Sequence, residues 1–194
     1  MSSNILNEHP VCRVCNNADV TFLCFTENGH SYSTVLNHYK CNNCSTVFVG
    51  NKVESEELGV AYATLNTKDY YKDIEIENKK KMNTAIVHLE SSIEKQSEII
   101  DIGTGNGLFI KLLNKAGYMN ISAHEIKGSD LSKIEKYAKQ IYQDFDYSSI
   151  PSRKFDAATM LDVLEHVLDP QFLINSVSRI LKEDGIIYFH TPVV

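Results

Sequence analysis

Four cysteines near the N-terminus have the spacing of a metal site. Cys12 and Cys15 form one Cys-x-x-Cys pair, and Cys41 and Cys44 form a second pair after 25 intervening residues. Two such pairs bring four thiolates around one ion, and a tetrahedral set of sulfur ligands suits Zn2+. Four protein ligands leave no open coordination position. The predicted zinc ion is therefore structural, and its binding supplies folding free energy to a small module.

The other candidate ligands of this segment leave alternatives open. His30 and His38 lie between the two pairs, and either one is able to replace a cysteine as a zinc ligand. Without a metal, the same residues would be ordinary reduced cysteines or a redox pair. The fifth cysteine, Cys24, is predicted to be a small residue of the core.

A glycine-rich run in the middle of the chain has the pattern of a ligand-binding turn. The apolar segment 98–102 leads into Asp101-x-Gly103-x-Gly105-x-Gly107, and a helix-like segment follows. Gly103 and Gly105 permit backbone angles that other residues resist, and they place no side chain between a ligand and the main chain. A helix that starts near Gly107 would present free N–H groups and the positive end of its dipole. Dinucleotide enzymes have the wider Gly-x-Gly-x-x-Gly spacing, so a nicotinamide cofactor is disfavoured.

The strands that follow the glycine run end in acidic residues. Glu125 ends the strand predicted over 120–125, about 20 residues beyond the run, where an acid accepts hydrogen bonds from ribose hydroxyls. Asp144 follows the strand predicted over 140–143, and Asp146 lies close to it. Each of these acids is also compatible with a solvated strand end or a turn.

Four blocks between about Ser97 and Pro192 together resemble the class I S-adenosylmethionine-dependent methyltransferases. They are the glycine run, the strand end at Glu125, the segment FDAATMLDVLEHV at 155–167 and the segment LKEDGIIYF at 181–189. The resemblance implies that S-adenosylmethionine is the cofactor and that ten residues bind it: Asp101, Gly103, Thr104, Gly105, Gly107, Glu125, Asp144, Phe145, Leu161 and Asp162. It also implies that Asp144, or alternatively Asp146, faces the adenine amino group.

His166 is the candidate catalytic base. It lies just beyond the strand predicted over 155–161, and ligands of open α/β sheets bind at the carboxyl ends of the strands. The unperturbed pKa of a histidine side chain lies near working pH, which suits a general base. Methyl transfer depends mainly on alignment of the nucleophile, so a base is needed only where the acceptor must lose a proton. The alternative is a histidine that contacts only the local backbone.

The candidate cofactor-binding residues and His166 belong to a segment, from residue 75 onward, in which predicted strands and helices alternate. This alternation is typical of a Rossmann-like, doubly wound and mostly parallel α/β sheet. Strands are predicted over 98–102, 120–125, 140–143, 155–161 and 186–190, and helices over 75–95, 108–116, 129–139 and 170–185. The basic run Lys79-Lys80-Lys81 is predicted to be the solvated face of the first helix.

The domains are predicted as a zinc-ribbon-like module at 1–50, a linker at 51–74 and the cofactor-binding domain at 75–194. The segment 39–49, which contains the second cysteine pair, resembles the zinc module before some bacterial methyltransferase domains, including those acting on nucleotide-linked sugars. Class I sheets have seven strands, so the resemblance implies that the last two strands are missing and the domain is incomplete at its C-terminus. The open edge of the fifth strand then predicts a homo-oligomer.

Composition argues against several classes of function. The 194 residues have a net charge of -6, which gives no general attraction to nucleic acid or to anionic membranes. The N-terminus lacks a secretory signal, and no apolar run reaches the ~18 residues of a membrane span, so a cytoplasmic location is expected.

The leading hypothesis is therefore methyl transfer to a small-molecule acceptor, such as a nucleotide sugar or a glycan precursor. One alternative is a non-catalytic cofactor-binding or interaction module. Another is an RNA methyltransferase, although Arg13 is the only arginine before Arg153 and the predicted ribbon is thus poor in arginine.

Overall fold

A computed structural model describes residues 10–27, 35–51, 75–126, 131–132 and 134–192. The chain divides into two compact units, each with its own β-sheet. The linker predicted at 51–74 lies outside the described residues, except for residue 51 itself. Within the described parts of the chain, no helix has both the length and the apolar character needed to cross a membrane.

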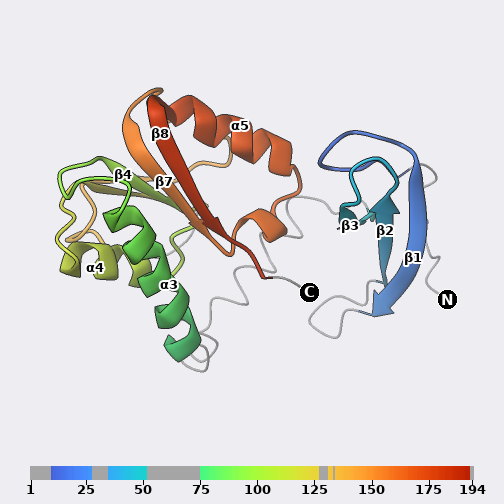
Figure 1. The fold of residues 1–194 in the computed structure, drawn as a ribbon, viewed down its shortest axis with the longest axis horizontal. Helices are drawn as coiled ribbons and strands as arrows, with labels where there is room; N and C mark the ends of the chain where they lie inside the picture. The colour runs from blue at the N-terminus through green and yellow to red at the C-terminus, as the bar shows by residue number, and fades with distance from the viewer. Residues whose placement is uncertain (1–9, 28–34, 52–74, 127–130, 133, 193–194) are drawn as a thin grey trace. The chain divides into compact units, whose positions relative to one another are not determined.

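The N-terminal unit is a three-stranded antiparallel sheet in the order β1-β2-β3 (Figure 1). Its strands are β1 (Val20–Glu27), β2 (Val35–Cys41) and β3 (Val47–Val49). The first cysteine pair precedes β1, and the second begins at the last residue of β2 and continues into the turn before β3. The buried core of this sheet is small and includes two of the cysteines: Cys12, Tyr39, Cys41 and Phe48. A core of this size supplies little hydrophobic stabilisation.

The larger unit is a five-stranded sheet in the order β6-β5-β4-β7-β8, with all neighbouring strands parallel. The strands are β4 (Ile99–Ile102), β5 (Ile121–His124), β6 (Gln140–Tyr142), β7 (Phe155–Leu161) and β8 (Leu181–His190). The chain builds the sheet outward from β4 in one direction and then returns to add β7 and β8 on the other side. The point where this direction reverses, between β4 and β7, is where open α/β sheets bind ligands.

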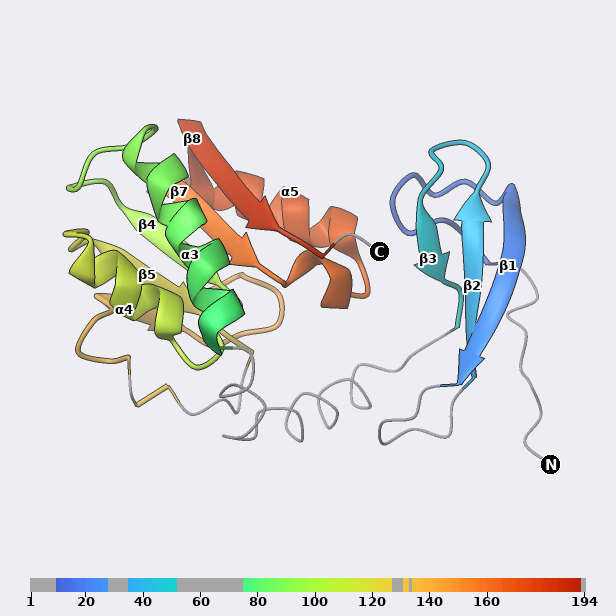
Figure 2. The same cartoon turned by 60° about the horizontal axis from the view of Figure 1, so that its bottom comes forward.

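Helices cover both faces of this sheet, as Figures 1 and 2 show. α3 (Glu75–Glu90) and α4 (Leu108–Lys115) lie on one face, and α5 (Pro170–Ile180) lies on the other. Alternate residues of the strands point to opposite faces. Accordingly Ile99 packs with Leu89 and Ile110 of the first two helices, whereas Ile100 packs in a second core with Val177 of α5. The fold is therefore the predicted doubly wound α/β sheet.

The element boundaries agree with the sequence in most places. β7 has the predicted bounds, and β4, β5 and β6 differ from theirs by one or two residues. The helix predicted up to Gly185 instead ends at Ile180, because residues from Leu181 onward already pair with β7 across a register shift. α3 ends at Glu90, before the predicted residue 95.

The helix predicted over 129–139 was wrong for the described part of that segment. Residues 131–132 and 134–139 form turns and bends. Leu131 and Ile134 are nevertheless buried in the core below α4. Their burial explains the apolar spacing that the sequence shows, since a segment can contribute core residues without a continuous helical period.

Candidate cofactor site and metal centre

The glycine run forms a tight turn from β4 into α4. Gly103, Gly105 and Gly107 all have left-handed backbone angles, with φ of 70°, 55° and 72°. A Cβ atom on Gly103 would lie 2.6 Å from Cγ2 of Val163, and one on Gly107 would lie 1.8 Å from Cγ2 of Ile134. Backbone conformation and close packing thus both require glycine at these two positions. The turn leads directly to Leu108, the first residue of α4, whose N–H donates to Oδ1 of Asn106 at 3.0 Å.

Glu125 joins the end of β5 to the glycine turn. Its Oε2 atom accepts a hydrogen bond of 2.7 Å from the Gly105 N–H, and its Oε1 atom accepts one of 2.8 Å from the Ile126 N–H. A carboxylate has about four lone-pair positions, so two further hydrogen bonds can still be accepted. This is the capacity needed to bind a pair of ribose hydroxyls.

Asp101 lies beneath the turn and is buried. The Thr159 hydroxyl donates a hydrogen bond of 2.7 Å to its Oδ1 atom. Burial raises the pKa of Asp101 to about 7, although hydrogen bonding to Thr159 opposes this change. The negative charge of Glu125 adds to the increase. A cation that approached the turn would favour the ionised form of this carboxyl group.

Replacing Asp101 with asparagine should change how stability depends on pH. Because burial raises its pKa from 3.8 to about 7, the neutral acid stabilises the native state fully below pH 3.8. This contribution is lost as the pH rises through the folded pKa of about 7. The free energy of unfolding of Asp101→Asn, measured relative to wild type, should therefore rise by on the order of 4 kcal/mol between pH 3.8 and about 7. Above about pH 7 this difference should change little. Urea unfolding at a series of pH values measures the gain, and a pH-independent difference would contradict this assignment.

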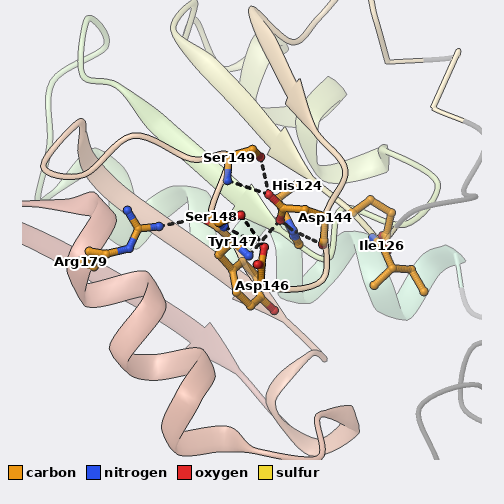
Figure 3. Close-up of polar contacts among 9 residues, drawn as sticks. His124, Ile126, Asp144, Asp146, Tyr147, Ser148, Ser149 and Arg179 are labelled. Atoms are coloured by element: carbon orange, nitrogen blue, oxygen red, sulfur yellow. Dashed lines mark hydrogen bonds and ion pairs between the residues drawn. The ribbon is translucent and has the colours of Figure 1, made fainter.

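The loop after β6 is ordered by Asp144 (Figure 3). Its carboxylate accepts hydrogen bonds from the Tyr147 N–H at 3.0 Å, from the Ser149 N–H at 2.9 Å and from the Ser149 hydroxyl. Nε2 of the buried His124 lies 3.2 Å from Oδ1 and 3.0 Å from the Asp144 carbonyl oxygen. Although burial alone would raise it, hydrogen bonds from Ser149 and His124 lower the pKa of Asp144 below its ordinary value.

Asp146 and Arg179 complete this loop. Asp146 accepts hydrogen bonds from the N–H and the hydroxyl of Ser148, at 3.1 and 2.7 Å. Arg179 of α5 donates to the carbonyl oxygens of Tyr147 and Ile150, at 2.6 and 3.0 Å. Both candidate adenine-binding acids thus make hydrogen bonds within the loop, and the role of either toward adenine stays a prediction.

Replacing Asp144 with alanine should disorder this loop, whereas replacing Asp146 should not. The first change leaves the Tyr147 N–H and the Ser149 N–H without their carboxylate acceptor, which costs about 1–3 kcal/mol of unfolding free energy. The second removes only contacts to Ser148 at an exposed position and should leave stability nearly unchanged. Urea unfolding of the two variants measures the difference. Equal losses would mean that the loop does not depend on Asp144.

The other predicted site residues lie around the same edge of the sheet. Phe145 is 66% exposed in the loop after β6, where its ring is accessible to a planar ligand. Leu161 is the last residue of β7, and Thr104 is buried in the glycine turn. His166 ends a short 3-10 helix (Leu164–His166), its side chain is 53% exposed, and its Nε2 atom lies 3.9 Å from the Glu165 carboxylate.

Asp162 lies between two basic side chains that the sequence did not connect with it. Its Oδ2 atom forms an ion pair with Lys81 of α3, and its Oδ1 atom lies 2.8 Å from Nδ1 of His190 at the end of β8. The prediction that Lys81 belongs to a solvated helix face was wrong, because its side chain is only 19% exposed. Neither partner was identified from the sequence.

The two cysteine pairs have matching backbone geometry. In the first, the Cys12 N–H donates to the Asn17 carbonyl and the Asn16 N–H donates to the Cys12 carbonyl. In the second, Cys41 makes the equivalent hydrogen bonds with Thr46 and Ser45. Asn16 and Ser45, which directly follow the last cysteine of each pair, both have positive φ angles, of 56° and 63°. Each pair therefore forms the same turn, in which two thiols point to one side.

The four thiols converge on a single point. All four Sγ atoms lie within 4.8 Å of one another. The separations across the pairs are 3.6 Å for Cys12–Cys44 and 3.5 Å for Cys15–Cys41. A tetrahedral zinc ion with Zn–S bonds of about 2.3 Å separates its ligands by roughly 3.8 Å, so this cluster fits zinc.

The other candidate residues of the N-terminal segment have different outcomes. Cys24 is exposed, so its prediction as a core residue was wrong. Nε2 of His38 lies 2.9 Å from the Thr26 hydroxyl, and the four cysteines already complete a ligand set without it. His30 lies outside the described residues.

The fold is that of a Rossmann-like domain with a glycine-rich turn at the carboxyl end of β4, beside the topological switch point. The family model described as "Methyltransferase domain" matches residues 75–194, and the chain belongs to that family. It shares 29% identity over 106 residues with the ubiquinone biosynthesis O-methyltransferase of Actinobacillus pleuropneumoniae serotype 7 (48% of this chain, 45% of the relative). It shares 28% identity over 104 residues with the enzyme of the same name from Coxiella burnetii strain RSA 493 (50% and 44%).

A solved structure agrees with this fold. The PH0226 protein from Pyrococcus horikoshii OT3 superimposes with a TM-score of 0.50 at 24% sequence identity, over 63% of this chain and 66% of that one. The matches to the two curated relatives above span less than half of their length.

Proposed function

We propose that this chain is an S-adenosylmethionine-dependent methyltransferase that acts on a small-molecule acceptor. The observation that carries the proposal is the joining of the glycine turn to Glu125 at the switch point of the sheet. The Gly105 N–H donates to the Glu125 carboxylate at 2.7 Å, so the turn and the ribose-binding acid form one site. The family match over residues 75–194 supports it.

The residues present fit this cofactor. The glycine turn and the start of α4 would hold its methionine part, Glu125 would accept hydrogen bonds from the ribose, and Phe145 would contact the adenine face. Burial raises the pKa of Asp101 to about 7, and a cationic ligand at the turn would favour its ionised form. When bound, S-adenosylmethionine supplies a methyl group that is already activated by the positive charge on sulfur. The protein's part is to align the acceptor with that methyl group.

A hydroxyl group is the acceptor that the comparisons favour. The curated relatives described above are named as O-methyltransferases of ubiquinone biosynthesis. A nucleotide sugar or a glycan precursor, as the zinc module's resemblance implies, also presents a hydroxyl group. The cysteine cluster would hold a structural zinc ion, because four thiolates leave no coordination position for a substrate.

The experiment that tests this function is a methyl-transfer assay on zinc-replete protein. Formation of S-adenosylhomocysteine is followed with phenols, nucleotide sugars and RNA as separate acceptor sets. Turnover with phenols or nucleotide sugars alone supports the proposal. Turnover with RNA alone would favour the nucleic-acid alternative, and salt-dependent RNA binding would accompany it.

A further inference from the structure

The end of β8 carries a histidine whose ring is oriented by a carboxylate. Nδ1 of His190 lies 2.8 Å from Oδ1 of Asp162. An ionised carboxylate can only accept hydrogen bonds, so Nδ1 must carry the proton and donate it. The backbones of the two residues are also bonded, since the Asp162 N–H donates to the His190 carbonyl at 2.9 Å. The imidazole is therefore oriented by Asp162, and in the neutral ring the lone pair is on Nε2.

Asp162 is itself held in place from the other side. Lys81 of α3 forms an ion pair with its Oδ2 atom, which places a positive charge beside the carboxylate. The backbone of Asp162 has a left-handed φ of 56°, an uncommon conformation for a residue other than glycine. Unfavourable backbone angles that the surrounding structure maintains are frequent at functional sites.

This pair lies next to the cofactor turn. Val163, which follows Asp162, occupies the space that a Cβ atom on Gly103 would need, at 2.6 Å. In the sheet, β7 and β8 lie on one side of β4, whereas β5 with Glu125 and β6 with the Asp144 loop lie on the other. Glu125 would hold the ribose and Phe145 would contact the adenine, so the part of the cofactor that supplies the methyl group would lie on the β7–β8 side of the ribose. His190 is on that same side of the sheet.

We propose that His190, oriented by Asp162, is the base that takes the proton from the acceptor hydroxyl group; this rests on the proposed function. Nε2 takes the hydroxyl proton as the acceptor oxygen forms its bond to the methyl carbon. The bond from that carbon to sulfur breaks, and its electron pair stays on the sulfur. The protonated imidazole then releases its proton to water. Asp162 is a positioning residue, and the more exposed His166 is not required as the base.

The first test needs neither cofactor nor acceptor. Long-range 1H–15N NMR spectra distinguish the two neutral histidine tautomers, and His190 should be the Nδ1–H form in the wild-type protein. Asp162→Ala should return it to the Nε2–H form, whereas Lys81→Gln should leave the tautomer unchanged because the Asp162 acceptor remains. An Nε2–H tautomer in the wild-type protein would overturn the proposal.

The second test places His190 relative to the methyl group. A base within about 3 Å of an oxygen that is itself about 3 Å from the methyl carbon lies within roughly 6 Å of that carbon. A nuclear Overhauser effect is therefore expected between the His190 ring and S-adenosylmethionine labelled with 13C at its methyl group. Bound cofactor without this effect would overturn the inference. Failure of the folded protein to bind the cofactor would instead overturn the proposed function on which it rests.

The third test measures turnover with the acceptors found by the methyl-transfer assay. His190→Gln should lower kcat by about 10²–10⁴-fold with unchanged cofactor affinity. The matched control is His88→Gln, the same substitution at an exposed position on α3. Retention of kcat within threefold by His190→Gln would contradict a role as base.

Discussion

Replacing Cys41 with serine should abolish zinc binding and unfold the N-terminal unit. Cys41 is fully buried in a core of four residues, and it contributes one of four convergent thiols. Binding of a structural zinc ion is worth about 10–16 kcal/mol in small zinc modules, far more than so small a core can supply. The larger unit has two cores of its own and should stay folded. Metal analysis with NMR spectra of the full chain measures both effects.

The matched control for this experiment is Cys24→Ser. Cys24 is exposed on β1 and does not belong to the convergent set, so the control should retain one zinc ion per chain and its β1–β2 amide signals. Chelation of zinc from the wild-type protein should reproduce the Cys41→Ser spectrum. A folded N-terminal sheet after complete chelation would show that the cysteines are not a structural metal site.

Replacing Gly107 with alanine should destabilise the larger unit by about 2–5 kcal/mol. A left-handed backbone costs alanine about 1–2 kcal/mol, and forcing a methyl group into filled space costs about 1–3 kcal/mol more. Both costs apply to Gly107, because its φ is 72° and an added Cβ atom would lie 1.8 Å from Cγ2 of Ile134. Urea unfolding of the zinc-loaded protein measures the loss.

Gly117→Ala separates these two contributions. Gly117 also has a positive φ, of 95°, but the nearest atom to its added Cβ is Lys95 Cδ at an ordinary 3.9 Å. This variant should lose only the backbone part, about 1–2 kcal/mol. An equal loss in the two variants would mean that the segment containing Ile134 does not pack against the turn as the structure shows.

Features that depend on local chemistry could be predicted from the sequence. The strand Phe155–Leu161 has its predicted bounds, because its apolar run is buried on both sides of the sheet. The four cysteines converge as their spacing indicated, since a Cys-x-x-Cys turn brings its own two thiols together. The glycine turn and Glu125 also meet, as parallel neighbouring strands end at the same edge.

Features that depend on register between distant segments could not be predicted. His190 meets Asp162 only because Leu161 is paired with His190 in the β7–β8 register, and no spacing in the sequence reveals that pairing. Lys81 looks like one lysine of a solvated run until α3 packs on the sheet and brings it to Asp162. Asp144 and Asp146 look equivalent in sequence, but only Asp144 contacts the buried His124.

The central claim is that the turn at Gly103–Gly107 binds S-adenosylmethionine, and isothermal titration calorimetry on zinc-replete protein tests it most directly. NAD is the control ligand, and Gly105→Arg is the control variant, because it puts a bulky cation on a left-handed residue of the turn (φ 55°). Binding of S-adenosylmethionine with a micromolar Kd, absent for NAD and lost in the variant, is the predicted result. No binding by the folded wild-type protein, or equal binding by Gly105→Arg, would contradict the account.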